Sequence, residues 1–308
     1  MFALQYSSFG PPDVLTVGPA EDPDAGPGEI RIAVRAAGVT PGDDLLRAGK
    51  MRPSLPWPHI PGIDAAGVVD QVGDGVTDVQ VGDEVFGAVD VTRLGGATAQ
   101  YAVLQFWAPR PVDLSWEQAA ALGTSAETAT RTLDLLDVRS GTTLLIDGAA
   151  GGVGSVAVQL AVARGARVIG TGSAENQDFL RGIGALAITY GPDLPGRVAR
   201  LVPDGVDAAL DIAGTGSLAD LVAITGTPER VVTIADFSAG DHGVHLSYTG
   251  SGDPDGRAGL AVAAELARTG RLHVLVRATF PLARAGEAHE LAAAGHGRGK
   301  VVLRVIED

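Results

Sequence analysis

The run Asp147-Gly148-Ala149-Ala150-Gly151-Gly152-Val153-Gly154-Ser155 constrains the fold most, because it joins an apolar strand-like segment to an apolar helix-like one. Gly151 and Gly152 allow a tight turn that brings the backbone close to a pyrophosphate, and Gly154 lets the helix pack closely on the sheet. The start of the helix offers free N–H groups and the positive end of its dipole to phosphates. We therefore predict a dinucleotide-binding turn with contacts at Ala150, Gly151, Gly152, Val153 and Gly154.

Strand-like and helix-like segments alternate on both sides of this turn. Residues 143–146 are apolar on both faces, as in a buried parallel strand, and 153–164 read as the helix that follows. Further strands are expected at 166–171, 185–189, 206–212, 230–235 and 273–279, with helices at 175–183 and 256–269. Ser115 is a candidate N-cap for a helix that runs past Leu122 to Leu136.

This alternation requires βαβ crossovers, so it predicts an α/β chain with a doubly wound parallel sheet. A purely structural turn is the alternative reading of the glycine run, since Ala149 stands where the first glycine is usual. The strand before the turn and the second strand after the helix favour dinucleotide binding.

The first 115 residues show a different pattern. Short apolar segments at 30–36, 65–69 and 83–87 are separated by turns rich in proline and glycine. This pattern predicts a barrel-like or sandwich-like β domain. A helix over 282–294 and a strand over 300–306 end the chain, and we expect them to return to this first domain.

The composition excludes several classes of protein. The net charge is −14 over 308 residues, so binding to nucleic acid or to an anionic membrane surface is not expected. No apolar run is long enough to span a bilayer, and the first residues lack the features of a signal peptide. There is no cysteine, which excludes disulfides, cysteine nucleophiles and thiolate metal sites. We therefore expect a cytoplasmic protein.

The end of the second strand bears on which dinucleotide binds. A cofactor with a free 2′-hydroxyl usually meets an Asp or Glu there, whereas this chain has Gly170-Thr171-Gly172-Ser173. The Ser173 hydroxyl suits a 2′-phosphate, so we expect Gly172 and Ser173 to contact NADP(H), with NAD(H) less favoured. Glu175 leaves two alternatives: it repels the phosphate if it points inward, or it is a solvated residue stabilised by the helix dipole.

Further motifs follow one another along nearly the whole chain. They are AGVTPGD at 37–43, PGIDAAGVV at 61–69, GDEVFG at 82–87, GGATAQY at 95–101, the glycine turn, GTGS at 170–173, VDAALD at 206–211 and GHGRGKVVL at 295–303. In this order and spacing, the chain resembles the medium-chain dehydrogenase/reductase superfamily and, within it, the quinone oxidoreductase-like proteins.

The resemblance implies a GroES-like, β-rich catalytic domain over residues 1–115 and 275–308 and a Rossmann dinucleotide-binding domain over 116–274. It also implies an active site between the two domains and a homodimer formed through the edge strand around 273–279. The zinc-dependent branch holds its metal with a cysteine and a histidine. This chain has no cysteine, and Ile63 stands where the histidine is expected, so we predict no metal site.

The reaction implied by the resemblance is hydride transfer from NADPH to a quinone or a conjugated enone without zinc. Hydrogen-bond donors would then stabilise the negative charge that develops on the substrate. Thr40 stands where relatives often have an asparagine near the nicotinamide, and it is either such a donor or a turn residue before Pro41. No tyrosine lies near Lys50, which argues against an enoyl-thioester reductase and leaves Lys50 as a candidate donor or a surface lysine.

The remaining candidate residues also rest on the resemblance. Thr128 aligns with a threonine that helps to hold the nicotinamide carboxamide. Glu127 departs from the family pattern: either the helix is shifted locally, or the carboxylate acts as a general acid or base. Other family positions that contact the cofactor are occupied here by Tyr190, Ala213, Gly214, Ile234, Ala235 and Lys300.

Two other functions stay open. One is a pathway-specific tailoring reductase that acts on a polyketide or aromatic intermediate, and the other is a non-catalytic NADPH-binding protein. Turnover of simple quinones would favour the general reductase. Tight NADPH binding without oxidation by any acceptor would favour the non-catalytic protein.

Overall fold

The computed structural model describes residues 1–248, 251–295 and 297–306, and all elements below belong to this part of the chain. The chain divides into two compact units. The first comprises Met1–Thr124, Leu260–Gly270 and Val274–Asp308, and the second comprises Ser125–Gly259 and Arg271–His273. The predicted domain boundaries at residues 115 and 275 stay a prediction.

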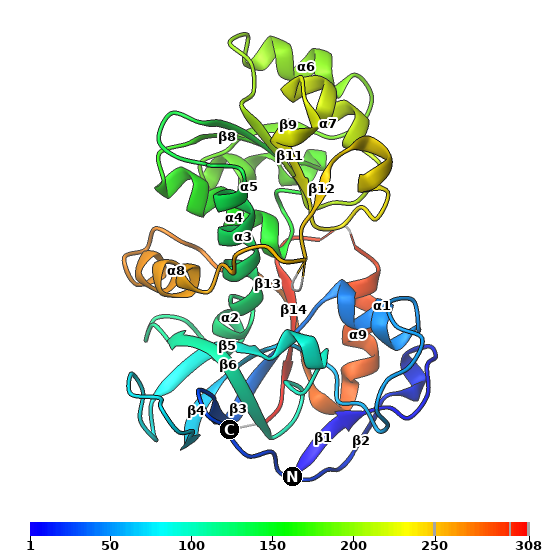
Figure 1. Cartoon of the computed structure of the whole chain (residues 1–308), viewed down its shortest axis with the longest axis vertical. Coiled ribbons are helices and arrows are strands. Elements are labelled where there is room, and N and C mark those ends of the chain that lie inside the picture. The colour runs from blue at the N-terminus through cyan, green and yellow to red at the C-terminus, as the bar shows by residue number, and fades with distance from the viewer. Residues whose placement is uncertain (249–250, 296, 307–308) are drawn as a thin grey trace. The chain divides into compact units, whose positions relative to one another are not determined.

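The second unit is built on a six-stranded parallel sheet, part of which is labelled in Figure 1. Its strands are β7 (Thr143–Asp147), β8 (Arg167–Gly172), β9 (Leu186–Thr189), β10 (Ala208–Asp211), β11 (Val231–Thr233) and β12 (His245–Leu246). The order across the sheet is β12-β11-β10-β7-β8-β9, so the strand order reverses between β7 and β10. This is the doubly wound sheet predicted from the sequence, and such sheets bind ligands where the order reverses.

The helices of this unit follow the strands in alternation. They are α4 (Gly152–Ala163), α5 (Gln177–Gly182), α6 (Leu194–Leu201) and α7 (Leu218–Thr225). Leu144, Leu145 and Ile146 of β7 have no exposed surface, which confirms the prediction of a strand buried on both faces. This rigid centre of the sheet carries the glycine turn at its carboxyl end.

The first unit is β-rich, as predicted. Its strands are β1 (Phe2–Gln5), β2 (Thr16–Pro19), β3 (Ile30–Val39), β4 (Asp64–Val72), β5 (Glu84–Val89), β6 (Tyr101–Pro109), β13 (Val276–Pro281) and β14 (Lys300–Arg304). The sheet order is β13-β14-β3-β4-β5-β6, and β3 also pairs with β6, so the sheet closes on itself like a barrel. Ile30, Ile32 and Val34 alternate inward along β3 and belong to the core that this closure encloses.

The remaining helices lie in the first unit or cross its boundary with the second. They are α1 (Pro41–Arg47), α2 (Trp116–Ala120), α3 (Gly123–Leu135), α8 (Ala258–Arg268) and α9 (Ala285–Ala293). Short 3₁₀ helices occupy Pro12–Val14, Val91–Arg93, Ala174–Asn176, Pro228–Arg230, Ala239–His242 and Leu282–Arg284. α3 begins in the first unit and runs on into the second.

The long helix expected from Ser115 to Leu136 is two helices. Ser115 does cap α2, in a capping box with Gln118, but α2 ends at Ala120. A second start follows at Gly123, where the Asp64 carboxylate accepts a hydrogen bond from the N–H of Thr124 at 2.5 Å. The prediction of one continuous helix was wrong because a buried carboxylate from β4 caps α3 independently.

The strand expected at 273–279 also differs. Residues 271–275 are not in a strand, and β13 starts at Val276. It pairs in parallel with β14 at the edge of the sheet in the first unit, not in the doubly wound sheet. The apolar run was read correctly as a strand, but its sheet depends on long-range pairing that local sequence does not encode.

Candidate functional site

The turn after β7 begins with a sharp change of chain direction at Gly148, whose φ of +84° lies in the left-handed region that favours glycine. Gly151 has an extended backbone, with φ −71° and ψ −179°, and it is the N-cap of α4. A Cβ on Gly154 would overlap the backbone of Gly148 and Ala149, so Gly154 allows the close packing that was predicted. Gly148 is therefore the left-handed residue of the tight turn, and Gly151 closes the turn by donating its N–H to the Gly148 carbonyl at 3.2 Å.

The start of α4 is suited to an anion. The N–H groups of Gly152, Val153 and Gly154 belong to its first turn, where helix geometry provides no partner within the helix. Within the described residues, no side chain caps this helix start, and a Cβ on Gly151 would meet only the Gly148 oxygen, at 3.5 Å, within 4 Å. The amides and the helix dipole together fit a phosphate.

Polar groups at the ends of β7 and β8 hold this turn in place. Thr171 Oγ1 accepts a hydrogen bond from the N–H of Gly148 at 3.1 Å and donates to the Asp147 carboxylate. Ser217 Oγ donates to the other oxygen of Asp147 at 2.6 Å. These residues were not predicted, although an acid directly before the glycine run was a visible signal.

A second carboxylate organises the neighbouring loops. Asp211, fully buried at the end of β10, accepts hydrogen bonds from the N–H groups of Ala213 and Gly214, both at 3.0 Å. It also accepts from Thr233 Oγ1 at 2.7 Å, and that hydroxyl in turn accepts from the N–H of Ala235 at 3.1 Å. Burial raises the pKa of Asp211 above its usual value, against the lowering effect of these hydrogen bonds.

The structure brings several predicted cofactor residues to one edge of the sheet. A Cβ on Gly148 would lie 3.0 Å from Ala213 N, and a Cβ on Gly214 would lie 2.7 Å from Ala235 O. Ile234 donates its N–H to the carbonyl of Asp211 at 3.0 Å. The loops after β7, β10 and β11 are therefore in mutual contact at the carboxyl ends of their strands.

The predicted 2′-phosphate position lies at the end of β8. Ser173 is partly buried, and its hydroxyl donates to Glu175 at 3.3 Å and accepts from the Asn176 amide at 2.9 Å. Glu175 itself is exposed, and its carboxylate lies beside the Ser173 hydroxyl. Tyr190 follows β9, which pairs with β8, and its side chain is exposed, leaving its ring free for stacking.

Thr128 and Glu127 lie together on α3 with Arg131. The Glu127 carboxylate forms an ion pair with Arg131 at 2.9 Å, and both side chains are buried. Thr128 donates its hydroxyl to Glu127 at 3.0 Å and is itself only partly buried. Glu127 thus lies within the continuous helix α3, paired with a residue one turn further along it.

The two catalytic candidates of the first unit lie at opposite ends of α1. Thr40 is its N-cap, and the Thr40 hydroxyl donates to the Asp43 carboxylate at 2.7 Å. Asp43 also accepts from the N–H of Thr40 at 2.7 Å and of Gly62 at 3.0 Å. Lys50 is exposed beyond the end of the helix. The two side chains are therefore not brought together.

Lys300 is buried within the first unit. Its ammonium donates to the carboxylate of Asp64 and, at 3.2 Å, to Thr124 Oγ1, which itself donates to Asp64 at 2.7 Å. Side-chain exposure is 7% for Lys300 and zero for Asp64. This buried triad occupies two of the three donors of the ammonium group.

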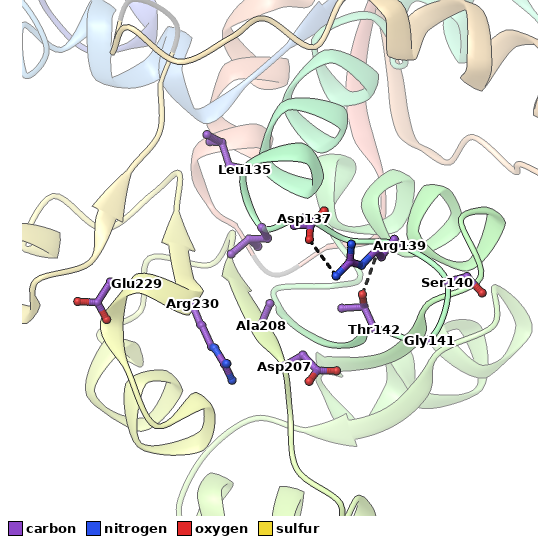
Figure 2. Close-up of a pocket in the computed structure, with 11 residues that line it drawn as sticks. Leu135, Asp137, Arg139, Ser140, Gly141, Thr142, Asp207, Ala208, Glu229 and Arg230 are labelled. Atoms are coloured by element: carbon purple, nitrogen blue, oxygen red, sulfur yellow. Dashed lines mark hydrogen bonds and ion pairs between the residues drawn. The ribbon is translucent and has the colours of Figure 1, made fainter.

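A surface hollow of about 520 Å³ lies at the opposite edge of the doubly wound sheet (Figure 2). Its wall includes Thr142 and Ala208, at the amino ends of β7 and β10, and the charged side chains of Arg139, Glu229 and Arg230. None of the predicted site residues lines it. The hollow is therefore separate from the edge that carries the glycine turn.

In residues 1–248, 251–295 and 297–306, no group of three or more His, Cys, Asp or Glu side chains has an arrangement that could hold a metal ion. Across the same described ranges, every helix is too short or too polar to cross a bilayer.

Two family models match the chain. Residues 26–112 match the alcohol dehydrogenase GroES-like domain, which confirms the GroES-like fold, and residues 187–303 match a model described as zinc-binding dehydrogenase. The second description concerns the family as a whole, and this chain contains no cysteine.

Individual relatives extend the similarity over the whole chain. An NADPH-dependent alkenal/one oxidoreductase from the chloroplast of Arabidopsis thaliana is 32% identical over 99% of this chain and 80% of its own length. A 2-methylene-furan-3-one reductase of Solanum lycopersicum is 35% identical over 76% of this chain, which spans only 62% of that relative. The solved quinone oxidoreductase of Coxiella burnetii is 28% identical over 99% of both chains, with a TM-score of 0.83.

Proposed function

Because the chain belongs to the quinone oxidoreductase-like family of the medium-chain dehydrogenase/reductase superfamily, we propose that it reduces a quinone or a conjugated enone with NADPH. The observation that carries the proposal is the turn after β7, where a left-handed Gly148 leads into the uncapped start of α4. Two relatives named as an NADPH-dependent alkenal/one oxidoreductase and a quinone oxidoreductase support the same reaction.

The residues present fit the dinucleotide. The amides of Gly152, Val153 and Gly154 would bind the pyrophosphate, and Asp147 and Thr171 keep the turn in the required conformation. NADPH, when bound, supplies the hydride. Further contacts are assigned to Ala150, Gly151, Gly172, Ser173, Thr128, Tyr190, Ala213, Gly214, Ile234 and Ala235.

The acceptor site needs a donor for the charge that develops on the substrate oxygen. Thr40 remains our candidate, but its single hydroxyl proton is donated to Asp43, so it must turn away from Asp43 to reach a substrate. Lys50 is exposed and stays a second candidate donor, and Glu127 a candidate acid or base. Lys300, with two donors engaged by Asp64 and Thr124, is proposed to stabilise the site and to have one donor left for the cofactor.

The decisive test is fluorescence titration of the purified protein with NADPH and with NADH. We expect NADPH to bind at least ten-fold more tightly, about 1.4 kcal/mol. Glu175→Gln should widen this preference, because the carboxylate is within 3.3 Å of the Ser173 hydroxyl and would repel a 2′-phosphate. Preference for NADH would show that the 2′-phosphate assignment is wrong, and failure to bind either cofactor would refute the proposed function.

Turnover is tested separately, with NADPH as donor and an ortho-quinone or a short-chain enone as acceptor. Consumption of NADPH that depends on the acceptor supports a general reductase. If NADPH binds tightly but no simple acceptor is reduced, the tailoring reductase or the non-catalytic protein is the better description.

The metal requirement, the oligomeric state and the location in the cell are also part of the proposal. We propose reduction without zinc, consistent with the absence of cysteine, and a homodimer in the cytoplasm. Full activity after dialysis against a strong chelator would support zinc independence. Sedimentation at micromolar concentration that shows only monomer would refute the dimer.

A further inference from the structure

A buried polar network on α3 surrounds the carboxylate of Glu127. Oε1 accepts hydrogen bonds from Arg131 Nε at 2.9 Å and from the N–H of Gly256 at 3.1 Å. Oε2 accepts from Thr128 Oγ1 at 3.0 Å and from Arg131 Nη2 at 3.4 Å. An ionised carboxylate has about four acceptor positions, so all positions of Glu127 are in use.

The same network extends from Arg131 to the segment after β12. Arg131 Nη1 donates to Ser247 Oγ, and Ser247 donates to the Asp253 carboxylate at 2.7 Å. Ser251 Oγ and His245 Nε2 also contact Asp253, at 2.7 and 2.9 Å. The guanidinium of Arg131 is therefore held from two directions and cannot rotate freely.

Two glycines bring the backbone of this segment directly against α3. A Cβ on Gly256 would overlap the carbonyl oxygen of Glu127 and lie 2.7 Å from the nitrogen of Arg131. A Cβ on Gly259 would overlap the Thr130 side chain. This close approach is what allows the N–H of Gly256 to reach the buried carboxylate, so the carboxylate orientation is set by the fold.

The network determines which hydrogen bonds the Thr128 hydroxyl donates and which it accepts. A hydroxyl has one proton to donate and two lone pairs to accept with. The proton goes to Glu127, and one lone pair accepts from Arg131 Nη2 at 3.4 Å. Thr128 is only partly buried, so its second lone pair is the hydrogen-bonding capacity left for a ligand.

We propose that Glu127 and Arg131 are positioning residues that present Thr128 to a bound ligand only as a hydrogen-bond acceptor. The group recognised at Thr128 is then an N–H donor, and with the proposed cofactor it is the amide NH₂ of the nicotinamide carboxamide. The inference rests on the proposed function, because the ligand is identified through it. It gives Glu127 a role that requires an intact ion pair, whereas donating a proton would require it to give up one of its four bonds.

The test compares NADPH with its acetylpyridine analogue, in which a methyl group replaces the carboxamide NH₂ and the carbonyl is retained. Dissociation constants are measured by fluorescence or calorimetry, without turnover. Wild type should bind NADPH about 3- to 10-fold more tightly than the analogue, the range expected for one neutral hydrogen bond. Thr128→Val should reduce this ratio to about one, and Thr128→Ser should keep it.

Glu127→Gln tests the positioning role itself. The donors Arg131 Nε and Gly256 N–H will keep the amide oxygen of Gln on their side, so the amide NH₂ faces Thr128. That NH₂ donates to Thr128 and frees the Thr128 proton, which can then bond the carbonyl that both ligands carry. The ratio should therefore fall to about one while NADPH still binds. Ser251→Ala, which removes a hydroxyl bonded to Asp253 but not to Glu127 or Thr128, should leave the ratio unchanged.

The outcomes separate the inference from the proposed function. If Glu127→Gln weakens both ligands equally and leaves the ratio unchanged, the pair is merely structural and the inference is wrong. If wild type binds NADPH and the analogue equally well, Thr128 is not an acceptor for the carboxamide, and the proposed function stands without it. If wild type binds neither, the proposed function itself fails.

Discussion

Two triads, each of one acid, one base and one threonine, meet at neighbouring turns of α3 and differ in how they are assembled. In one, Asp64 is paired with Lys300 and both contact Thr124. In the other, Glu127 is paired with Arg131 and both contact Thr128. Each threonine donates its hydroxyl to the acid and accepts from the base.

The difference lies in the distance along the chain. Lys300 and Asp64 are 236 residues apart, so their contact joins β14, β4 and the start of α3 only once the first unit has folded. Glu127 and Arg131 are separated by one helical turn, a spacing at which such pairs also form in isolated helices. One triad is therefore a product of the tertiary fold, and the other is partly present in local structure.

The largest effect is expected from Lys300→Met, which leaves the fully buried Asp64 without its cation. Removing one partner of a buried pair costs about 3–5 kcal/mol of unfolding free energy. Denaturant unfolding should show this loss, and Lys50→Met, at an exposed lysine, should change the free energy by no more than about 0.5 kcal/mol. A loss below about 1 kcal/mol for Lys300→Met would show that the triad is not stabilising.

Arg131→Met should cost less, about 2–3 kcal/mol in the same measurement. Glu127 keeps the donors of Gly256 and Thr128, and the pair can form transiently in the denatured state, which lowers its net contribution. Equal losses for Lys300→Met and Arg131→Met would indicate that burial alone sets the loss of unfolding free energy, and that the separation of the partners along the chain does not affect it.

A matched serine pair tests how far the second triad extends. Ser247→Ala breaks the link between Arg131 and Asp253 and should cost about 1–2 kcal/mol, since it leaves a buried guanidinium donor without its partner. Ser251→Ala also removes a hydroxyl from Asp253 but does not touch Arg131, so we expect about 0.5 kcal/mol. Hydrogen exchange of the Gly256 amide should speed up in Ser247→Ala more than in Ser251→Ala. Faster exchange in Ser251→Ala than in Ser247→Ala would show that Ser251, and not Ser247, holds the segment around Gly256 in place.

The smallest effect concerns pH. Burial raises the pKa of Asp253, but hydrogen bonds from Ser251, Ser247 and His245 outweigh it and leave the pKa below its usual value. A lowered folded-state pKa adds stability above the unfolded pKa, about 3.9, which is lost as pH falls through the folded value. The stability difference between wild type and Asp253→Asn should therefore be larger at neutral pH than in acid. A stability difference that grew in acid would contradict the assignment.

Much of the fold was predictable because it follows from local pattern. The apolar run of β7, the glycine turn and the alternation of strands and helices indicated a doubly wound sheet, and the sheet order confirms it. The break between α2 and α3 was not predictable, because it depends on a hydrogen bond from the N–H of Thr124 to the carboxylate of Asp64, which lies on the distant strand β4. Local pattern therefore located the elements, and distant side chains set some of their limits.

The candidate site also combines residues that could be predicted from the sequence with residues that could not. The cofactor positions Ala213, Gly214 and Ala235 were placed by resemblance, and the structure brings their loops into contact beside Gly148. The groups that hold those loops, Asp211 and Thr233, were not predicted, since each acts through hydrogen bonds to residues on other strands. The cofactor positions could be predicted because they belong to motifs that the chain shares with the family. The supporting contacts could not, because they depend on which strands lie side by side.

Residue types at short, regular spacings predicted the class of fold and the position of the glycine turn, and the order of motifs along nearly the whole chain indicated the family. Contacts within the folded chain were needed to show that Gly148 is the left-handed residue of the turn, that Lys300 is paired inside the first unit and that the Glu127 carboxylate accepts four hydrogen bonds. These contacts could not be read from the sequence because the partners of a buried polar group are set by packing. Packing brings together residues whose separation along the chain carries no signal.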